Sequence, residues 1–293
     1  MVFEGLYLIE LYLEQSISKN GYCIELCRPL LSVGLCLSQE LARERSYSPN
    51  SNYYFIYDKR LLKHPQILED QIKLEIVYTC KAIPVMSLPT VACFFVEVRG
   101  YSKLYDDVND TRLGMIGIFV SMFTFIAFTD MLIYWIHRFL HHKQVYKHLH
   151  KAHHKWKVPT PFASHAFHPM DGFLQSCPYH IYPFLFPLHK FTYLALFVFV
   201  NIWTVSIHDG DYRVPKTLRP FVNGSAHHMD HHLFYNYNYG QFFTLWDRLC
   251  GSFRNPSSFE GCGPLDEMKK MELEQEKPTL RRSTRNRAAN KEK

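Results

Sequence analysis

The sequence predicts an all-α protein of integral membrane helices with a histidine-rich helical catalytic region facing the cytosol. Three observations lead to this prediction: long apolar stretches, 17 histidines of which all but His64 lie between His137 and His232, and basic residues beside the first of these histidines. Hydrophobic residues make up 47% of the 293 residues, which excludes a disordered chain. Eight cysteines without a CxxC pair do not indicate a disulfide-stapled scaffold.

Three apolar regions are candidate membrane segments. Residues 113–136 are the clearest, because Asp130 is their only charge and about 20 apolar residues cross a bilayer. Residues 74–98 are interrupted by charges and two prolines. Residues 179–207 are too short for two full spans, which need roughly 40 residues, so we expect a tilted or shallow hairpin bent near 183–190. Buried helices of a soluble protein are the alternative interpretation.

Asp130 is the one charge in the clearest apolar segment. A carboxylate inside a membrane span is costly to expose to lipid. We therefore expect Asp130 to face the functional site or a buried polar partner.

The two ends of the chain differ from its centre. Residues 1–15 could form a short amphipathic helix, but residues 1–52 hold no apolar run long enough to span and no signal-peptide pattern. Residues 266–293 are charged, and their basic end is expected to be a disordered tail or, alternatively, a contact for anionic lipid. The central residues 53–265 are therefore the expected functional domain.

Histidines form three clusters with the spacing of metal ligands. They read HRFLHH at 137–142, HKAHH at 150–154 and HMDHH at 228–232. On an α-helix, positions i, i+3 and i+4 share one face, so each cluster can present two or three imidazoles to a common point. Imidazole suits iron, zinc, copper or nickel, and one ion cannot use so many ligands. The spacing therefore predicts a dinuclear metal centre.

The remaining histidines are assigned separately. His142 and His227 could be ligands or could orient a ligand, and His165 and His168 could line or brace the site. The isolated histidines are expected to have only surface or core roles: His64, His148, His180 and His189.

Basic residues surround the first two histidine clusters: Arg138, Lys143, Lys147, Lys151, Lys155 and Lys157. Such an excess favours the cytosolic side of a membrane. The third cluster must lie on the same side if it joins the first two.

The order of the clusters beside a membrane segment resembles the fatty acid hydroxylase superfamily. Longer segments resemble its sterol C5-desaturases (lathosterol oxidases) more closely: RGYSKLYDD at 99–107, PTPFASHAFHPMDGF at 159–173, SIHDGDYRVP at 206–215 and NGSAHHMDHHLFYNYNYGQFFTLWDRLCGSF at 223–253. The resemblance covers about 53–265. In that family a first transmembrane helix precedes the segment corresponding to 53–66, and residues 1–50 do not resemble it.

The resemblance implies a di-iron oxidoreductase of the endoplasmic reticulum membrane. It would introduce the C5–C6 double bond into a Δ7-sterol, converting lathosterol to 7-dehydrocholesterol in cholesterol biosynthesis. O2 would be the co-substrate, and electrons would come from NAD(P)H through cytochrome b5 and its reductase, which the basic face could dock. The ligands carried over by position are His137, His141, His142, His150, His153, His154, His228, His231, His232 and His208.

Other functions remain open from the residues alone. The clusters would equally serve a sterol C4-methyl oxidase or a fatty acyl hydroxylase, a catalytically impaired membrane protein with an altered amino-terminal region, or a structural zinc module. No nucleic-acid module accompanies the basic tail. Six aromatic residues are candidates for lining an apolar substrate pocket: Phe162, Phe167, Phe173, Tyr235, Tyr237 and Trp246.

Overall fold

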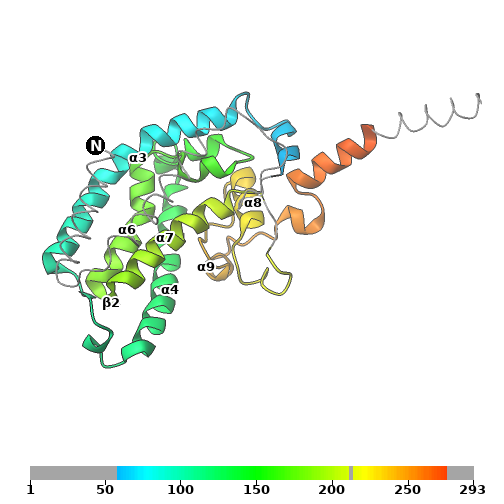
Figure 1. Cartoon of the computed structure of the whole chain (residues 1–293). Helices are drawn as coiled ribbons and strands as arrows, with labels where there is room; N and C mark the ends of the chain where they lie inside the picture. The colour runs from blue at the N-terminus through cyan, green and yellow to red at the C-terminus, as the bar shows by residue number, and fades with distance from the viewer. Residues whose placement is uncertain (1–57, 211–213, 276–293) are drawn as a thin grey trace, which may run out of the picture.

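The computed structural model describes residues 58–210 and 214–275 of the chain (Figure 1). Helices make up most of this part, and its two strands, β1 (Leu104–Tyr105) and β2 (Leu188–His189), have two residues each. The predicted all-α membrane class is therefore confirmed. The predictions for residues 1–52 and for the basic tail lie outside the described residues.

Helix α3 (Gln71–Val96) is the first of three helices long and apolar enough to cross a membrane. It contains Pro84 and Pro89, each of which removes one backbone N–H donor and bends a helix. Figure 1 shows the resulting change of direction along α3. A single π-helical turn at Glu97–Tyr101 follows, and Gly100 there adopts φ +82°, which favours glycine.

Helix α4 (Gly114–Leu140) is the second membrane-length helix. It begins where the sequence predicts, but it continues four residues beyond the predicted end at 136. His137 is therefore part of its last turn, and His141 is the residue that caps it. The first histidine cluster is consequently held by the same rigid helix that crosses the apolar region.

Helices α6 (Pro169–Leu185) and α7 (Lys190–Ile207) flank the bend predicted near 183–190. Helix α7 is the third membrane-length helix, whereas α6 has 17 residues. Between them, β2 pairs in parallel with β1, which lies in the connection between α3 and α4. The hairpin thus reaches as far as that connection. The predicted range 179–207 is shorter than the observed hairpin. Helix α6 starts ten residues earlier, at Pro169, in a segment of mixed polarity.

The main core lies between α4, α6 and α7. Phe125 and Ile133 of α4 pack with Tyr182 of α6 and with Leu196 of α7, and all four side chains are buried. The rings of Phe125 and Tyr182 meet edge to face with centroids 5.1 Å apart, a favoured aromatic geometry. This core fixes the ends of the helices that carry the histidines.

Shorter elements cover the histidine-bearing end. They are η1 (Lys59–Lys63), α5 (Lys143–Tyr146), η4 (His153–Lys155), η5 (Pro161–His165), α8 (Ser225–Phe234), α9 (Leu245–Leu249), η6 (Ser257–Glu260) and a helix at 264–275. The short helix η3 (Val108–Asp110) lies instead in the connection between β1 and α4. A second buried cluster of Leu61, Val158, Met229 and Leu265 joins η1, α8 and the last helix. Figure 1 places α8 at the opposite end of the molecule from β2.

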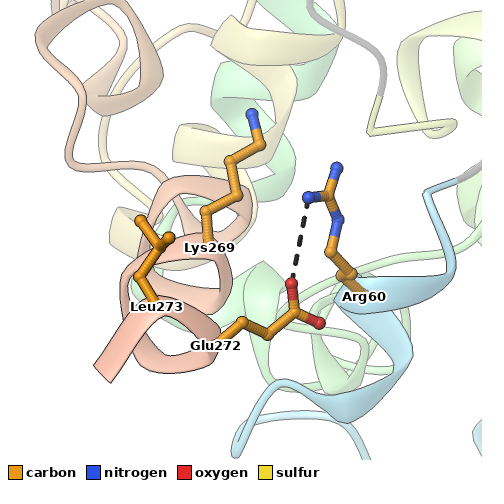
Figure 2. A pocket seen from close by; sticks show the side chains of 4 residues that line it. All are labelled: Arg60, Lys269, Glu272 and Leu273. Carbon is orange, nitrogen blue, oxygen red and sulfur yellow. Dashed lines mark ion pairs between the residues drawn. The ribbon is translucent and has the colours of Figure 1, made fainter. Parts of the chain in front are cut away.

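A small surface hollow lies between η1 and the helix at 264–275 (Figure 2). Arg60, Lys269, Glu272 and Leu273 line it, and Arg60 Nη1 lies 3.9 Å from Glu272 Oε2. Exposed pairs of this kind contribute little to stability. None of the clustered histidines borders this hollow, so the chemistry must lie elsewhere.

Two buried carboxylates connect the bundle helices to the loops around the histidines. Asp130 Oδ1 of α4 accepts backbone N–H groups from Phe242 at 2.7 Å and Phe243 at 3.2 Å. Glu75 of α3 accepts hydrogen bonds from Gln71 and from the Thr160 hydroxyl. The prediction that Asp130 has a buried polar partner is confirmed.

Replacing Asp130 with alanine should strip two buried N–H groups of their acceptor. We expect Asp130→Ala to lower the free energy of unfolding by about 1–3 kcal/mol, measured by thermal unfolding in detergent. Asp106→Ala is the matched control, because that side chain is 71% exposed and pairs with Lys190 at the surface. Equal shifts for the two variants would contradict the role assigned to Asp130.

Candidate metal centre

Nine histidines converge in two buried groups. One group of five consists of His137, His141, His150, His154 and His231, and its possible ligand atoms all lie within 4.8 Å of one another. A group of four, with the same closeness, consists of His153, His208, His228 and His232. All except the half-buried His141 are buried. The structure thus brings together side chains separated by up to 94 residues, from His137 to His231.

Helix geometry explains how the third cluster serves both groups. His228 and His232 are four residues apart on α8, so their side chains differ in direction by roughly 40° and enter the group of four. His231 is rotated about 100° from His232 and enters the group of five. One short helix therefore supplies ligands to two neighbouring positions.

The second cluster is not an α-helix, so the prediction of a helical face is wrong there. Residues 147–152 form turns and His153–Lys155 a 3-10 helix. The backbone N–H of His153 donates to the carbonyl of His150 at 3.0 Å. In this tighter backbone His150 and His154 enter the group of five, while His153 enters the group of four.

Backbone carbonyls determine which nitrogen of several rings carries the proton. The Nδ1 atoms of His137, His231 and His208 lie 2.9, 2.7 and 2.7 Å from the carbonyl oxygens of Tyr239, Tyr237 and Thr204, respectively. A carbonyl oxygen can only accept, so these Nδ1 atoms donate. Their Nε2 atoms are left with bare lone pairs directed into the two groups.

The converging nitrogens have the arrangement of ligands around a cation. The Nε2 atoms of His137 and His150 are 3.1 Å apart, and those of His208 and His228 are 3.0 Å apart. Burial lowers the pKa of His208 to about 4 and the pKa values of His228 and His231 well below the usual value. Neutral imidazoles with facing lone pairs are metal ligands, so the donor set fits two metal ions.

The chemistry of the ligand atoms limits which metals the two groups suit. Both groups contain nitrogen ligands only, and each of the cysteines among the described residues lies outside them. Structural zinc sites often use thiolates and close with four ligands, whereas here nine imidazoles form one paired arrangement. The set suits a redox-active first-row metal such as iron.

Two predicted candidates are not in either group. His142 is exposed and stands at the amino-terminal end of α5. His227 is buried against Phe253 and Phe259, with ring centroids 6.0 and 5.5 Å away. Their neighbours His141 and His228 are the members of the groups. His227 and His228 project about 100° apart round the axis of α8, whereas His142 has an extended backbone between α4 and α5.

The other histidines have individual contacts away from the two groups. His64 pairs with Glu267 at 3.2 Å, and His189 Nε2 lies 3.0 Å from the Asp106 carbonyl. His180 contacts Glu97 and Tyr193 in the helix bundle, His165 contacts Ser164 and Asn201, His168 caps α6, and His148 is exposed.

Sequence reasoning missed the groups that hold the histidines in place. Asp171 lies 2.7 Å from Nδ1 of His150, and both side chains are fully buried. Asp247 accepts the N–H groups of Tyr239 and Gly240 at 2.8 Å and so fixes the loop whose carbonyl receives His137. No sequence pattern reveals which backbone carbonyl will accept a hydrogen bond from a histidine. For Asp171 the sequence did offer a signal, because it is the carboxylate of the HPMDGF segment.

Two of the six aromatic candidates lie against the imidazoles. The ring of Tyr235 is 4.9 Å from that of His154, and the ring of Phe167 is 5.8 Å from that of His153. Tyr237 contributes its backbone carbonyl to His231. The assignment of Phe162, Phe173 and Trp246 to an apolar substrate pocket stays a prediction.

Comparison with known proteins agrees with this geometry. Residues 122–252 match the family described as Fatty acid hydroxylase. A lathosterol oxidase of Mus musculus is 66% identical over 220 residues, which is 75% of this chain and 74% of the relative. A lathosterol oxidase of Homo sapiens is 64% identical over the same length and shares. A Delta(7)-sterol 5(6)-desaturase of Leptosphaeria maculans is 55% identical over 222 residues, 76% of this chain and 59% of the relative.

No solved structure matches the chain significantly. The family match includes all nine histidines of both groups and runs from within α4 past α9. The long alignments with the lathosterol oxidases extend the similarity well beyond the histidine clusters. By its sequence, and in agreement with its paired histidine centre, the chain belongs to the fatty acid hydroxylase family.

Proposed function

We propose that this protein is a sterol C5-desaturase, a membrane oxidoreductase that introduces the C5–C6 double bond into a Δ7-sterol. The main support is the pair of converging histidine groups at the end of a bundle with three membrane-length helices. The chain that carries them is 64–66% identical to lathosterol oxidases. The reaction balances when one O2 takes two hydrogen atoms from the sterol and two electrons with two protons from a donor, leaving as two waters.

We assign the ligands of two iron ions to the nine converging histidines, with five holding one ion and four the other. A redox-active iron pair supplies the one-electron oxygen chemistry that removal of hydrogen from an unactivated C–H bond requires. His142 and His227 are outside this ligand set.

The surrounding residues have three tasks in this reaction. The carbonyls of Thr204, Tyr237 and Tyr239 hold ring orientation and keep the protons on Nδ1. Burial of the rings excludes water, which would compete for the metal positions. Phe167 and Tyr235 provide apolar walls beside the imidazoles, where a mostly apolar sterol would pack.

The basic face is the proposed docking surface for the electron donor. Five lysines of the first two clusters are exposed: Lys143, Lys147, Lys151, Lys155 and Lys157. Their charge favours an acidic partner such as cytochrome b5, which with its reductase would deliver electrons from NAD(P)H. The same excess supports a topology with the histidines on the cytosolic side, and the membrane in this proposal is that of the endoplasmic reticulum.

Expression of this chain in cells that lack sterol C5-desaturation tests the proposed reaction. We expect the accumulated Δ7-sterol to be converted to a product two hydrogens lighter, measured by mass spectrometry of extracted sterols. A product that gains oxygen would instead indicate a C4-methyl oxidase or a hydroxylase. An unchanged sterol profile with normal protein levels would indicate a non-enzymatic membrane protein.

Alanine substitutions test the assignment of ligands to two ions. We expect His150→Ala and His228→Ala each to lower the metal content of the purified protein from two ions per chain towards one, and to reduce desaturation to background. Elemental analysis of protein purified without oxygen measures both the number and the identity of the ions. Zinc without iron would contradict the proposed cofactor.

Controls for these substitutions are available in the same region. His148 is exposed and lies outside both groups, so His148→Ala should keep two ions. His142→Ala should behave in the same way, because its side chain is exposed and belongs to neither group. Loss of an ion from His142→Ala would overturn the ligand set of nine.

A further inference from the structure

Asp171 is a buried carboxylate that touches one histidine of the metal centre. It lies in the first turn of α6, and its side chain, like that of His150, has no exposed surface. Its Oδ2 lies 2.7 Å from Nδ1 of His150, and its Oδ1 accepts a hydrogen bond from Nε2 of Gln175 at 2.8 Å. Both carboxylate oxygens therefore have a hydrogen-bonding partner, and the two contacts fix the orientation of the Asp171 side chain.

The contact determines the form of the His150 ring. Because the carboxylate is an acceptor, Nδ1 of His150 donates, and the lone pair on Nε2 faces the group of five. A carboxylate accepting from one ring nitrogen also raises the electron density at the other, which makes that nitrogen a stronger ligand. Asp171 reaches the ion only through His150.

This support is unequal between the two groups. In the group of five, His150 has a carboxylate, and His137 and His231 have carbonyl acceptors. In the group of four, His208 has the carbonyl acceptor of Thr204. Each group also has a ring whose Nδ1 lacks a hydrogen-bond partner in the described part of the chain, His154 in the group of five and His153 in the group of four. The five-histidine position is thus both richer in ligands and better oriented.

We propose that Asp171 is a positioning residue of the metal centre, which holds His150 so that the group of five binds its divalent ion more tightly than the group of four. The inference rests on the proposed function only in requiring that both groups bind metal. It predicts stepwise loading, with the five-histidine position filled first.

The placement of Asp171 on α6 gives this contact a wider consequence. The same helix carries Tyr182, part of the core between α4, α6 and α7. A side chain added at Gly172 would collide with Phe167 and Met86, so the start of α6 packs closely against its neighbours. The orientation of His150 is therefore tied to the packing of the bundle.

Titration of the full, metal-free chain in detergent with Co²⁺ tests the proposal against a competing chelator. We expect two binding steps for the unmodified protein. Asp171→Asn, which keeps the shape and removes the charge, should weaken the tighter step by about 10- to 100-fold and leave the weaker step unchanged. Asp171→Glu restores a carboxylate and should recover part of the loss.

Two further variants separate positioning from simple loss of structure. Asp130→Asn makes the same change at a buried carboxylate that accepts backbone N–H groups and touches no histidine, so it should lower the unfolding temperature but weaken Co²⁺ binding less than Asp171→Asn does. Gln175→Leu removes the donor that orients Asp171 and should weaken the tighter step less than Asp171→Asn does. It serves as the test if Asp171→Asn does not fold.

Each contrary result has a distinct meaning. Two Co²⁺ steps of unmodified affinity in both Asp171→Asn and Gln175→Leu would overturn the inference and leave the proposed function intact. An equal weakening in Asp130→Asn would also overturn it, because the effect would then follow from stability. Failure of the unmodified chain to bind Co²⁺ would overturn the proposed function together with this inference.

Discussion

The rest of this structure depends on one constraint: imidazole nitrogens with free lone pairs face one another inside the two histidine groups. Neutral imidazole nitrogens about 3 Å apart repel one another unless a cation lies between them. An acceptor at a defined place keeps the proton of a ring on its outward nitrogen. The carbonyl of Thr204 in α7 and the carbonyls of Tyr237 and Tyr239 in the loop after α8 supply such places for three of the rings.

Carboxylates on the bundle helices connect the segments around the histidines to the apolar core. Glu75 of α3 accepts from Thr160, Asp130 of α4 accepts from Phe242 and Phe243, and Asp171 of α6 contacts His150. Each is buried, so each is costly without its partner. The centre consequently forms one unit with the helix ends, where an apolar substrate from a bilayer can meet buried ligands.

Local patterns predicted the elements whose period is regular. Helix α4 and the helical third cluster follow from apolar length and from i, i+4 spacing. The start of α6 did not follow, because Asp171 and Gln175 look like surface residues until their buried partners are known. The second cluster has helical spacing but a tighter backbone, since its histidines must reach two positions rather than one.

The sequence by itself determined the class of protein, the imidazole chemistry of the site and all nine histidines that converge, together with His142, which does not, because ligand type and apolar length are properties of the residues. Only the tertiary structure decided which imidazoles lie together in one group and which neighbour, His141 or His142, turns inward. It also decided which carbonyls and carboxylates hold the rings. These choices depend on the relative placement of α4, α6, α7 and α8, and contacts between distant segments leave no local pattern in the chain.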